Sequence, residues 1–203
     1  MGGAGDLRNL LSLCGQSNVP LEQPAMARML GSLHLLRKDV TEWTSFSEVG
    51  YQRVLIHRTP QFEVLLLCWR SGQRSAIHDH AGSTCGIKVI AGAATETTYA
   101  ASPCGRLYPV RSRCLETGSV CVNRDADIHQ MANLAPAGQD LITLHIYSPP
   151  LAAARIYSIG ETVLADHDCL AARRPRDLAR RIRVDRPHAG SSSAPRRASK
   201  VMQ

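Results

Sequence analysis

The sequence predicts an all-β protein, either an antiparallel sandwich or a barrel, with a helical layer at its N-terminus. Residues 7–40 repeat apolar side chains at three- and four-residue steps, which is the period of an α-helix. From Tyr51 onward the period changes, and short β-type runs are separated by Gly, Pro, Ser and Asp. Because no helical pattern is interleaved with these runs, the strands are expected to pair antiparallel.

The expected elements follow the chain in order. Pro20 and Pro24 stand where a helix of the N-terminal layer would start. The β-type runs cover residues 51–57, 61–69, 85–92, 94–100, 106–110, 119–124, 128–134, 140–148 and 155–160. A last short helix is expected at residues 172–183. The predicted organisation is a helical layer at 1–44, one β domain at 45–168 and a basic, flexible tail at 169–203.

The positive charge of the chain is concentrated in its tail. The formal net charge is +7, from 24 Lys and Arg against 17 Asp and Glu. Residues 171–203 hold ten of the basic and two of the acidic side chains, so the rest of the chain is close to neutral. A basic tail can bind nucleic acid, but this one has no aromatic residue to stack on bases. We therefore expect no nucleic-acid partner.

The cysteines and the apolar runs bear on the compartment. The seven cysteines form no CxxC pair, and no secretory signal precedes them. This pattern predicts free thiols in a reducing cytoplasm, most of them buried. No run approaches the roughly 18 apolar residues of a membrane-spanning helix, so we expect no membrane partner. We also expect a monomer.

Three histidines are candidates for a metal site. His78 and His80 stand at alternate positions of a predicted strand, so their imidazoles should project from the same face, with Asp79 on the other. His129 lies in another predicted strand and is followed four residues later by Asn133. A lone histidine is more often an ordinary core or surface residue. The paired histidines together with the distant third one favour a metal ion.

The spacing of these residues resembles the two conserved motifs of cupins. The first runs from Gly72 through His78, His80 and Cys85 to Gly92, and the second joins Gly118 to His129 and Asn133. Ordinary cupins place a glutamate where this chain has Cys85. With that substitution, the stretches "YQRVLIH", "LLLCWRSGQRSAIHDHAGSTCGIKVIAG" and "LITLHIYSPPL" resemble the cysteine dioxygenase family of thiol dioxygenases over roughly residues 50–151. The resemblance implies a cupin barrel, also called a jelly roll or double-stranded β-helix.

The resemblance also implies roles for individual residues. It makes His78, His80 and His129 the ligands of Fe(II), and Arg53 the group that binds the substrate carboxylate through its guanidinium fork. The remaining positions that it matches line the pocket or act beside the metal: Tyr51, Trp69, Cys85, Thr143, His145 and Tyr147.

Two of these positions carry open alternatives. Cys85 and Tyr147 match a pair that forms a thioether cross-link in some family members, and the alternative is an unmodified thiol beside a buried phenol. Thr143 stands where the family has serine in a Ser-x-His-x-Tyr relay with His145 and Tyr147. Threonine keeps the hydroxyl, so the hydrogen bond can survive.

The function implied is that of an Fe(II)- and O2-dependent cysteine dioxygenase, which converts L-cysteine to cysteine sulfinate. Three neutral imidazoles leave the metal without an anionic protein ligand, and this suits a substrate that brings its own thiolate charge. One alternative is a dioxygenase for 3-mercaptopropionate or another small thiol. A second, from a different class, is a metal-binding cupin that serves as a sensor or binding module. A zinc or manganese cupin isomerase would lack its usual glutamate ligand.

Overall fold

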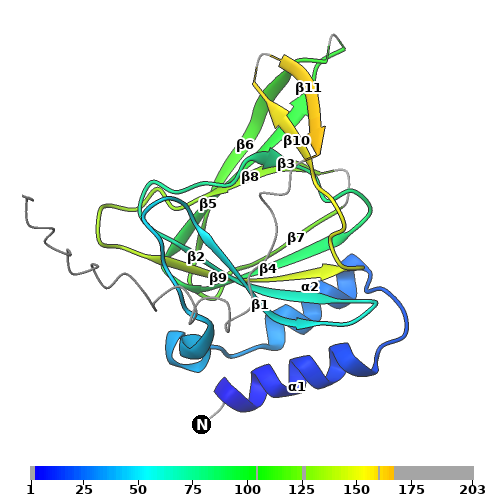
Figure 1. The fold of residues 1–203 in the computed structure, drawn as a ribbon, viewed down its shortest axis with the longest axis vertical. Coiled ribbons are helices and arrows are strands. Elements are labelled where there is room, and N and C mark those ends of the chain that lie inside the picture. Colours follow the sequence, from blue (N-terminus) through cyan, green and yellow to red (C-terminus); the bar gives the residue numbers. More distant parts are fainter. Residues whose placement is uncertain (1–2, 104, 125–126, 160, 167–203) are drawn as a thin grey trace, which may run out of the picture.

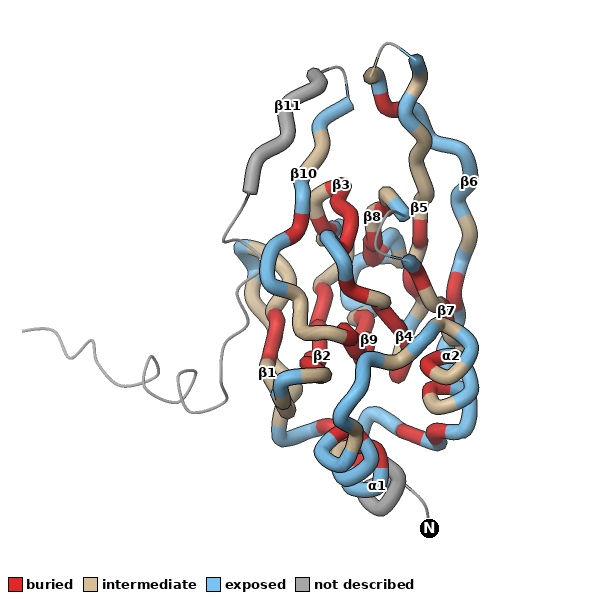
Figure 2. Tube along the Cα trace, turned by 90° about the vertical axis from the view of Figure 1, so that its right-hand side faces the viewer, coloured by how far each residue is buried: buried red, intermediate tan, exposed pale blue. Residues whose placement is uncertain are grey.

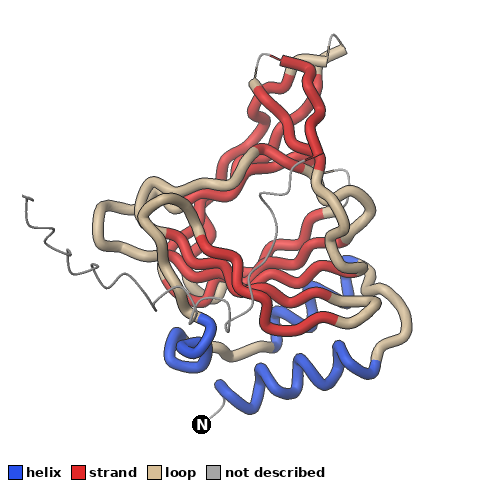
Figure 3. The backbone as a smooth tube through the Cα atoms, viewed as in Figure 1, coloured by secondary structure: helices blue, strands red, loops and turns tan. Residues whose placement is uncertain are grey.

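The computed structural model describes residues 3–103, 105–124, 127–159 and 161–166. Two antiparallel sheets face each other, and the N-terminal helices cover the outer face of one of them (Figures 1 and 3). The predicted all-β class with N-terminal helices and a cupin barrel is confirmed. The expected tail at 169–203 and the helix expected at 172–183 lie outside the described residues.

The N-terminal region contains two α-helices and a 3-10 helix. These are α1 (Gly3–Gln16), α2 (Gln23–Ser32) and η1 (Arg37–Trp43). Pro24 occupies the first turn of α2, where its missing N–H costs no hydrogen bond. Within the described part of the chain, none of the helices combines the length and apolar character that crossing a bilayer would need.

In the described part of the chain, eleven strands build the two sheets. Their bounds are β1 (Gln52–Arg58), β2 (Glu63–Trp69), β3 (Ile77–His78), β4 (Thr84–Ala91), β5 (Ala93–Ala101), β6 (Leu107–Glu116), β7 (Val120–Asn123), β8 (Ile128–Ala132), β9 (Leu141–Ser148), β10 (Arg155–Ser158) and β11 (Glu161–Asp166). One sheet has the order β1-β2-β9-β4-β7, and the other has the order β11-β10-β3-β8-β5-β6.

The five-stranded sheet is buried on both faces, as β2 illustrates. Every residue of β2 is buried, and alternate side chains belong to different cores. Val64, Leu66 and Cys68 pack with the helices, whereas Leu65 and Leu67 pack inside the barrel. Figure 2 shows the buried residues concentrated on the strands, where the two sheets face each other and where the helices cover one sheet. The helical layer therefore closes the outer face of the sheet, and the barrel interior stays available for a site.

The contact between α2 and β4 depends on a glycine. A Cβ atom at Gly86 would lie 2.5 Å from Met26 Cγ and 2.6 Å from Leu30 Cδ1, both of which are buried. Gly86→Ala is therefore expected to destabilise the fold by about 1–3 kcal/mol through overpacking, measured as the free energy of unfolding in urea. Gly31→Ala in α2 is the control. A Cβ atom there meets nothing within 4 Å, so it should stabilise the protein by roughly 0.5–1 kcal/mol. Equal effects from the two substitutions would contradict this account.

Candidate metal centre and substrate pocket

The three candidate histidines converge inside the barrel. His78 ends β3 and pairs directly with His129 of β8. The expectation that both His78 and His80 lie on one strand is wrong for His80, because β3 ends at His78. His80 still reaches the cluster. A turn follows it, which is closed by a hydrogen bond from the Ser83 N–H to the His80 carbonyl oxygen at 3.0 Å. The candidate ligand nitrogens of all three lie within 4.8 Å of one another. All three side chains are buried.

Each imidazole is oriented through its Nδ1 atom. Nδ1 of His78 lies 3.0 Å from the Ala76 carbonyl oxygen, and Nδ1 of His80 lies 3.4 Å from the Arg124 carbonyl oxygen. Nδ1 of His129 lies 3.0 Å from Oε1 of Glu96. The opposite nitrogens therefore face the cluster, and Nε2 of His80 and of His129 are 3.2 Å apart. Two nitrogens bound at right angles to one ion at about 2.1 Å would be about 3 Å apart, so the spacing of this pair fits a shared metal ion.

Burial keeps the imidazoles of His78 and His80 neutral. It lowers the pKa of His78 to about 3, with a further contribution from the neighbouring His129. Burial, together with His129 and His78, also holds the pKa of His80 well below its ordinary value. A neutral imidazole has a free nitrogen lone pair, which is the form that binds metal. In the described part of the chain the cluster consists of three histidines and contains no carboxylate.

Glu96 of β5 is a site residue that sequence reasoning missed. Its carboxylate is completely buried, and Oε2 accepts a hydrogen bond from Arg113 Nε at 2.7 Å and forms an ion pair with Nη2 at 2.6 Å. Oε1 accepts a hydrogen bond from Asn123 Nδ2 at 3.0 Å and also lies next to Nδ1 of His129. Burial alone would raise the pKa of Glu96, but His129 and Arg113 outweigh it and lower the pKa. The carboxylate is therefore ionised behind the His129 ring.

Asp79 stands between His78 and His80 and contacts strand β10. Its buried carboxylate accepts hydrogen bonds from the Tyr157 hydroxyl at 2.7 Å and lies 2.7 Å from Arg155 Nε. The backbone N–H of Ala81 donates to the same carboxylate at 3.2 Å. These contacts fix the His-x-His segment to its neighbouring strand.

A narrow pocket opens beside the histidines and is lined by the residues predicted to bind the substrate. Its lining is formed by Tyr51, Arg53, Leu67, Trp69, Ser75, His78, His129, Met131, His145 and Tyr147. Arg53 is 7% exposed, and its Nε atom has no hydrogen-bond partner among the described residues. The Arg53 Cζ atom lies 5.8 Å from the centre of the Tyr147 ring. Tyr51 stacks on Trp69 with ring centres 4.1 Å apart.

The pocket wall carries a chain of hydrogen bonds along β9. Trp69 Nε1 donates to Thr143 Oγ1 at 3.0 Å, and Thr143 Oγ1 lies 2.9 Å from His145 Nε2. His145 Nδ1 lies 3.4 Å from the Tyr147 hydroxyl. Burial, together with Arg53, holds the pKa of His145 well below its ordinary value. The indole can only donate, so the proton of Thr143 is left for Nε2. With the proton placed there, the neutral ring donates Nδ1–H to Tyr147. The Tyr147 proton is then free to face the pocket.

Cys85 lies next to this series of hydrogen bonds. It pairs with Tyr147 across β4 and β9, and both side chains are buried. Burial raises the pKa of each, so the thiol and the phenol are protonated at neutral pH. Cys14, Cys68 and Cys121 are also buried free thiols. The thioether cross-link between Cys85 and Tyr147 stays a prediction.

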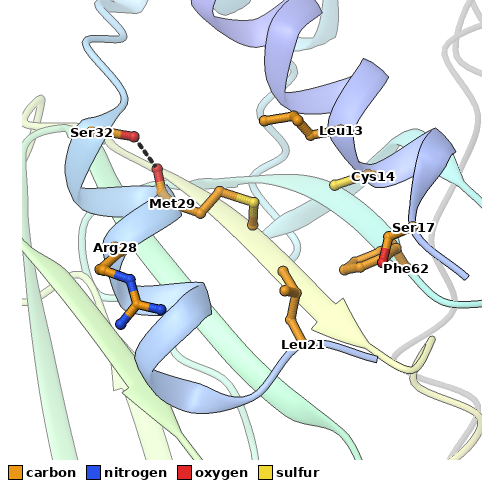
Figure 4. A pocket seen from close by; sticks show the side chains of 8 residues that line it. All are labelled: Leu13, Cys14, Ser17, Leu21, Arg28, Met29, Ser32 and Phe62. Carbon is orange, nitrogen blue, oxygen red and sulfur yellow. Dashed lines mark hydrogen bonds between the residues drawn. The ribbon is translucent and has the colours of Figure 1, made fainter. Parts of the chain in front are cut away.

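A second cleft lies on the helical side of the five-stranded sheet. Figure 4 shows its lining, which consists of Leu13, Cys14, Ser17, Leu21, Arg28, Met29, Ser32 and Phe62. This lining is mostly apolar and includes none of the clustered histidines. The barrel pocket, which joins the histidines to Arg53 and Tyr147, is therefore the candidate site.

Comparisons with known proteins identify relatives of the chain. The chain is 31% identical to cysteine dioxygenase type 1 of Homo sapiens over 119 residues, which are 55% of this chain and 59% of that protein. It is 26% identical to cysteine dioxygenase type 1 of Danio rerio over 130 residues, 59% of this chain and 62% of that protein. The chain thus spans about three-fifths of the length of these relatives.

Solved structures with a similar fold include a Klebsiella pneumoniae protein with a double-stranded β-helix domain. The likeness covers 58% of this chain and 87% of that one, with 20% identity and a TM-score of 0.49. KdgF from a Halomonas species is similar over 52% of this chain and 84% of its own, with 21% identity and a TM-score of 0.42. The family model for cysteine dioxygenase type I matches residues 19–159, which include the three histidines and the whole pocket, and the chain therefore belongs to the cysteine dioxygenase type I family.

Proposed function

We propose that the chain is an Fe(II)-dependent cysteine dioxygenase, which adds both atoms of O2 to the sulfur of L-cysteine and releases cysteine sulfinate. The observation that carries the proposal is the shared pocket of a three-histidine cluster and a buried arginine. Arg53 lines the same cavity as His78 and His129, and its Nε atom has no partner in the described part of the chain. A small ligand with a carboxylate at one end and a metal-binding group at the other fits this arrangement.

The three imidazoles are suited to hold Fe(II) through their Nε2 atoms. Imidazole also suits zinc, copper and nickel, so the ligand set does not select the metal by itself. Oxidation of a thiol by O2 requires a redox-active metal, which zinc is not. When bound, Fe(II) would supply a site for the thiolate and the electron transfer that O2 activation needs.

The residues of the chain would position the substrate and control one proton. Arg53 would bind the carboxylate through two parallel hydrogen bonds. The hydrogen-bond chain from Trp69 through Thr143 and His145 would hold the Tyr147 hydroxyl with its proton towards the pocket. The reaction breaks the O–O bond and forms two S–O bonds, and the sulfur supplies all four electrons. No external reductant is needed.

The proposal is tested with protein purified anaerobically and loaded with Fe(II). We expect one bound iron per chain, one O2 consumed per L-cysteine, and cysteine sulfinate as the product by mass spectrometry. A kcat/KM for 3-mercaptopropionate well above that for L-cysteine would instead make the chain a dioxygenase for that thiol. Metal binding without any thiol-dependent O2 uptake would support a binding module.

A further inference from the structure

The three metal-site histidines do not share one kind of Nδ1 partner. His78 and His80 each face a backbone carbonyl oxygen, which can only accept a hydrogen bond. Those two rings therefore carry their proton on Nδ1 and keep Nε2 open. His129 instead meets two side chains of opposite character. Its Nδ1 atom is 3.0 Å from Glu96 Oε1, an acceptor, and 3.2 Å from Asn123 Nδ2, a donor.

These two neighbours favour different tautomers of His129. A carboxylate in front of Nδ1 requires a proton on Nδ1 and leaves Nε2 with its lone pair. An amide N–H in front of Nδ1 does the opposite and moves the proton to Nε2, which faces His80 at 3.2 Å. A proton at that position would occupy the place of the metal.

The surroundings of Glu96 decide the competition in favour of the carboxylate. Arg113 holds Oε2 through both Nε and Nη2, and the Cys121 thiol lies 3.3 Å from Oε1. Asn123 Nδ2 donates to Oε1 at 3.0 Å, shorter than its 3.2 Å separation from His129. The amide N–H is thus engaged by the carboxylate and withdrawn from the ring. Arg113 also balances the charge of Glu96, so the pair adds no net charge to the ligand set.

We propose that Glu96 is a positioning residue, which keeps the His129 proton on Nδ1 and thereby leaves Nε2 open to the metal. Partners of this kind orient a ligating imidazole, and their loss typically costs about 10–100-fold in metal affinity. The inference rests on the metal site of the proposed function and is independent of the thiol substrate.

The test compares Glu96→Gln with the double variant Glu96→Gln/Asn123→Asp. In the single variant, Arg113 holds the oxygen of the introduced amide and its N–H₂ group faces His129, so the proton should move to Nε2. In the double variant, an introduced carboxylate replaces the Asn123 amide that lies 3.2 Å from His129 Nδ1, and the amide at position 96 can donate to it. The total charge then equals that of the wild type. The control is Asp140→Asn, which alters a carboxylate–arginine pair with Arg70 away from the histidines.

Two measurements report on these proteins. The ¹⁵N chemical shifts of the histidine rings in metal-free protein give the tautomer, and titration with Co²⁺ gives the metal affinity. We expect the Nδ1–H tautomer of His129 in the wild type, the Nε2–H tautomer and about 10–100-fold weaker Co²⁺ binding in Glu96→Gln, and recovery of both in the double variant. Asp140→Asn should match the wild type.

The outcomes separate this inference from the proposed function. An Nε2–H tautomer of His129 in the wild type overturns the inference even if Glu96→Gln does not fold. Unchanged Co²⁺ affinity in Glu96→Gln also overturns it, as does failure of Asn123→Asp to restore affinity in the folded double variant. If the wild type itself binds no Co²⁺ or Fe²⁺, the metal site fails and both proposals fall.

Discussion

Replacing His129 with Ala is expected to abolish both metal retention and formation of cysteine sulfinate. The substitution removes one of the three nitrogens that face the cluster and leaves two, which is too few to hold a divalent ion against water. The loss of affinity should exceed the roughly 10–100-fold that follows loss of an outer partner of a ligand. The iron content of protein purified from iron-supplemented cells, together with product analysis, checks this result.

The matched control for His129→Ala is His57→Ala. His57 lies on β1 and is not part of the histidine cluster in the described residues. Its loss should leave the iron content and the product yield within about twofold of the wild type, as is usual for a change remote from the site. Full iron content in His129→Ala, with a folded protein by circular dichroism, would contradict the assignment of His129 as a ligand.

The part of this site that is local in the chain could be predicted from the sequence. Alternation along an extended segment is enough to bring His78 and His80 to one face, even though β3 ends at His78. The pairing of His78 with His129 is different, because it depends on the register of strands about fifty residues apart. Periodicity contains no information on that register. The grouping of His129 with the other two histidines came from the resemblance to a known family.

Glu96 shows what periodicity misses inside a strand. The run "ATETTYA" has no apolar alternation to say which face is buried, and glutamate is among the residues least often found in a core. The buried face is set by pairing: Glu96 is opposite Met131 and Thr98 is opposite His129, so Glu96 is a diagonal neighbour of the ligand. The structure, not the sequence, identifies this face as buried: Ala94, two residues before Glu96, is completely buried.

The edge strand of the six-stranded sheet is also longer than the sequence predicts. A strand is expected at residues 106–110, whereas β6 extends from Leu107 to Glu116. The strand lies at the end of the sheet order, and its one partner among the described strands is β5. Most of its side chains are exposed, so polar residues are tolerated on both faces and the alternating pattern of a half-buried strand is lost.

Arg53→Ala should lower kcat/KM for L-cysteine about a hundredfold while the protein keeps its metal. Charge-assisted hydrogen bonds contribute about 1.5–3 kcal/mol each, and removal of a two-pronged contact of about 3 kcal/mol in total corresponds to that factor. The loss should appear mainly in KM, because the contact holds the unreacted end of the substrate. Steady-state O2 uptake and iron analysis measure the two quantities. Arg58→Ala on the same strand is the control, since the Arg58 side chain is 54% exposed and pairs with Glu63.

Cysteamine, which lacks the carboxylate, separates recognition of the substrate from support of Tyr147. Arg53 lies against the Tyr147 ring, so its removal could slow the reaction by displacing the phenol. If Arg53 binds the carboxylate, Arg53→Ala should reduce kcat/KM for L-cysteine much more than for cysteamine, and the wild type should discriminate between the two thiols about a hundredfold. An equal loss with both thiols would show that Arg53 acts through Tyr147 alone. The Nε of Arg53 is buried beside the histidine cluster and has no partner among the residues that the structure describes. This favours the first result, because a buried donor without a partner is costly unless a ligand completes it.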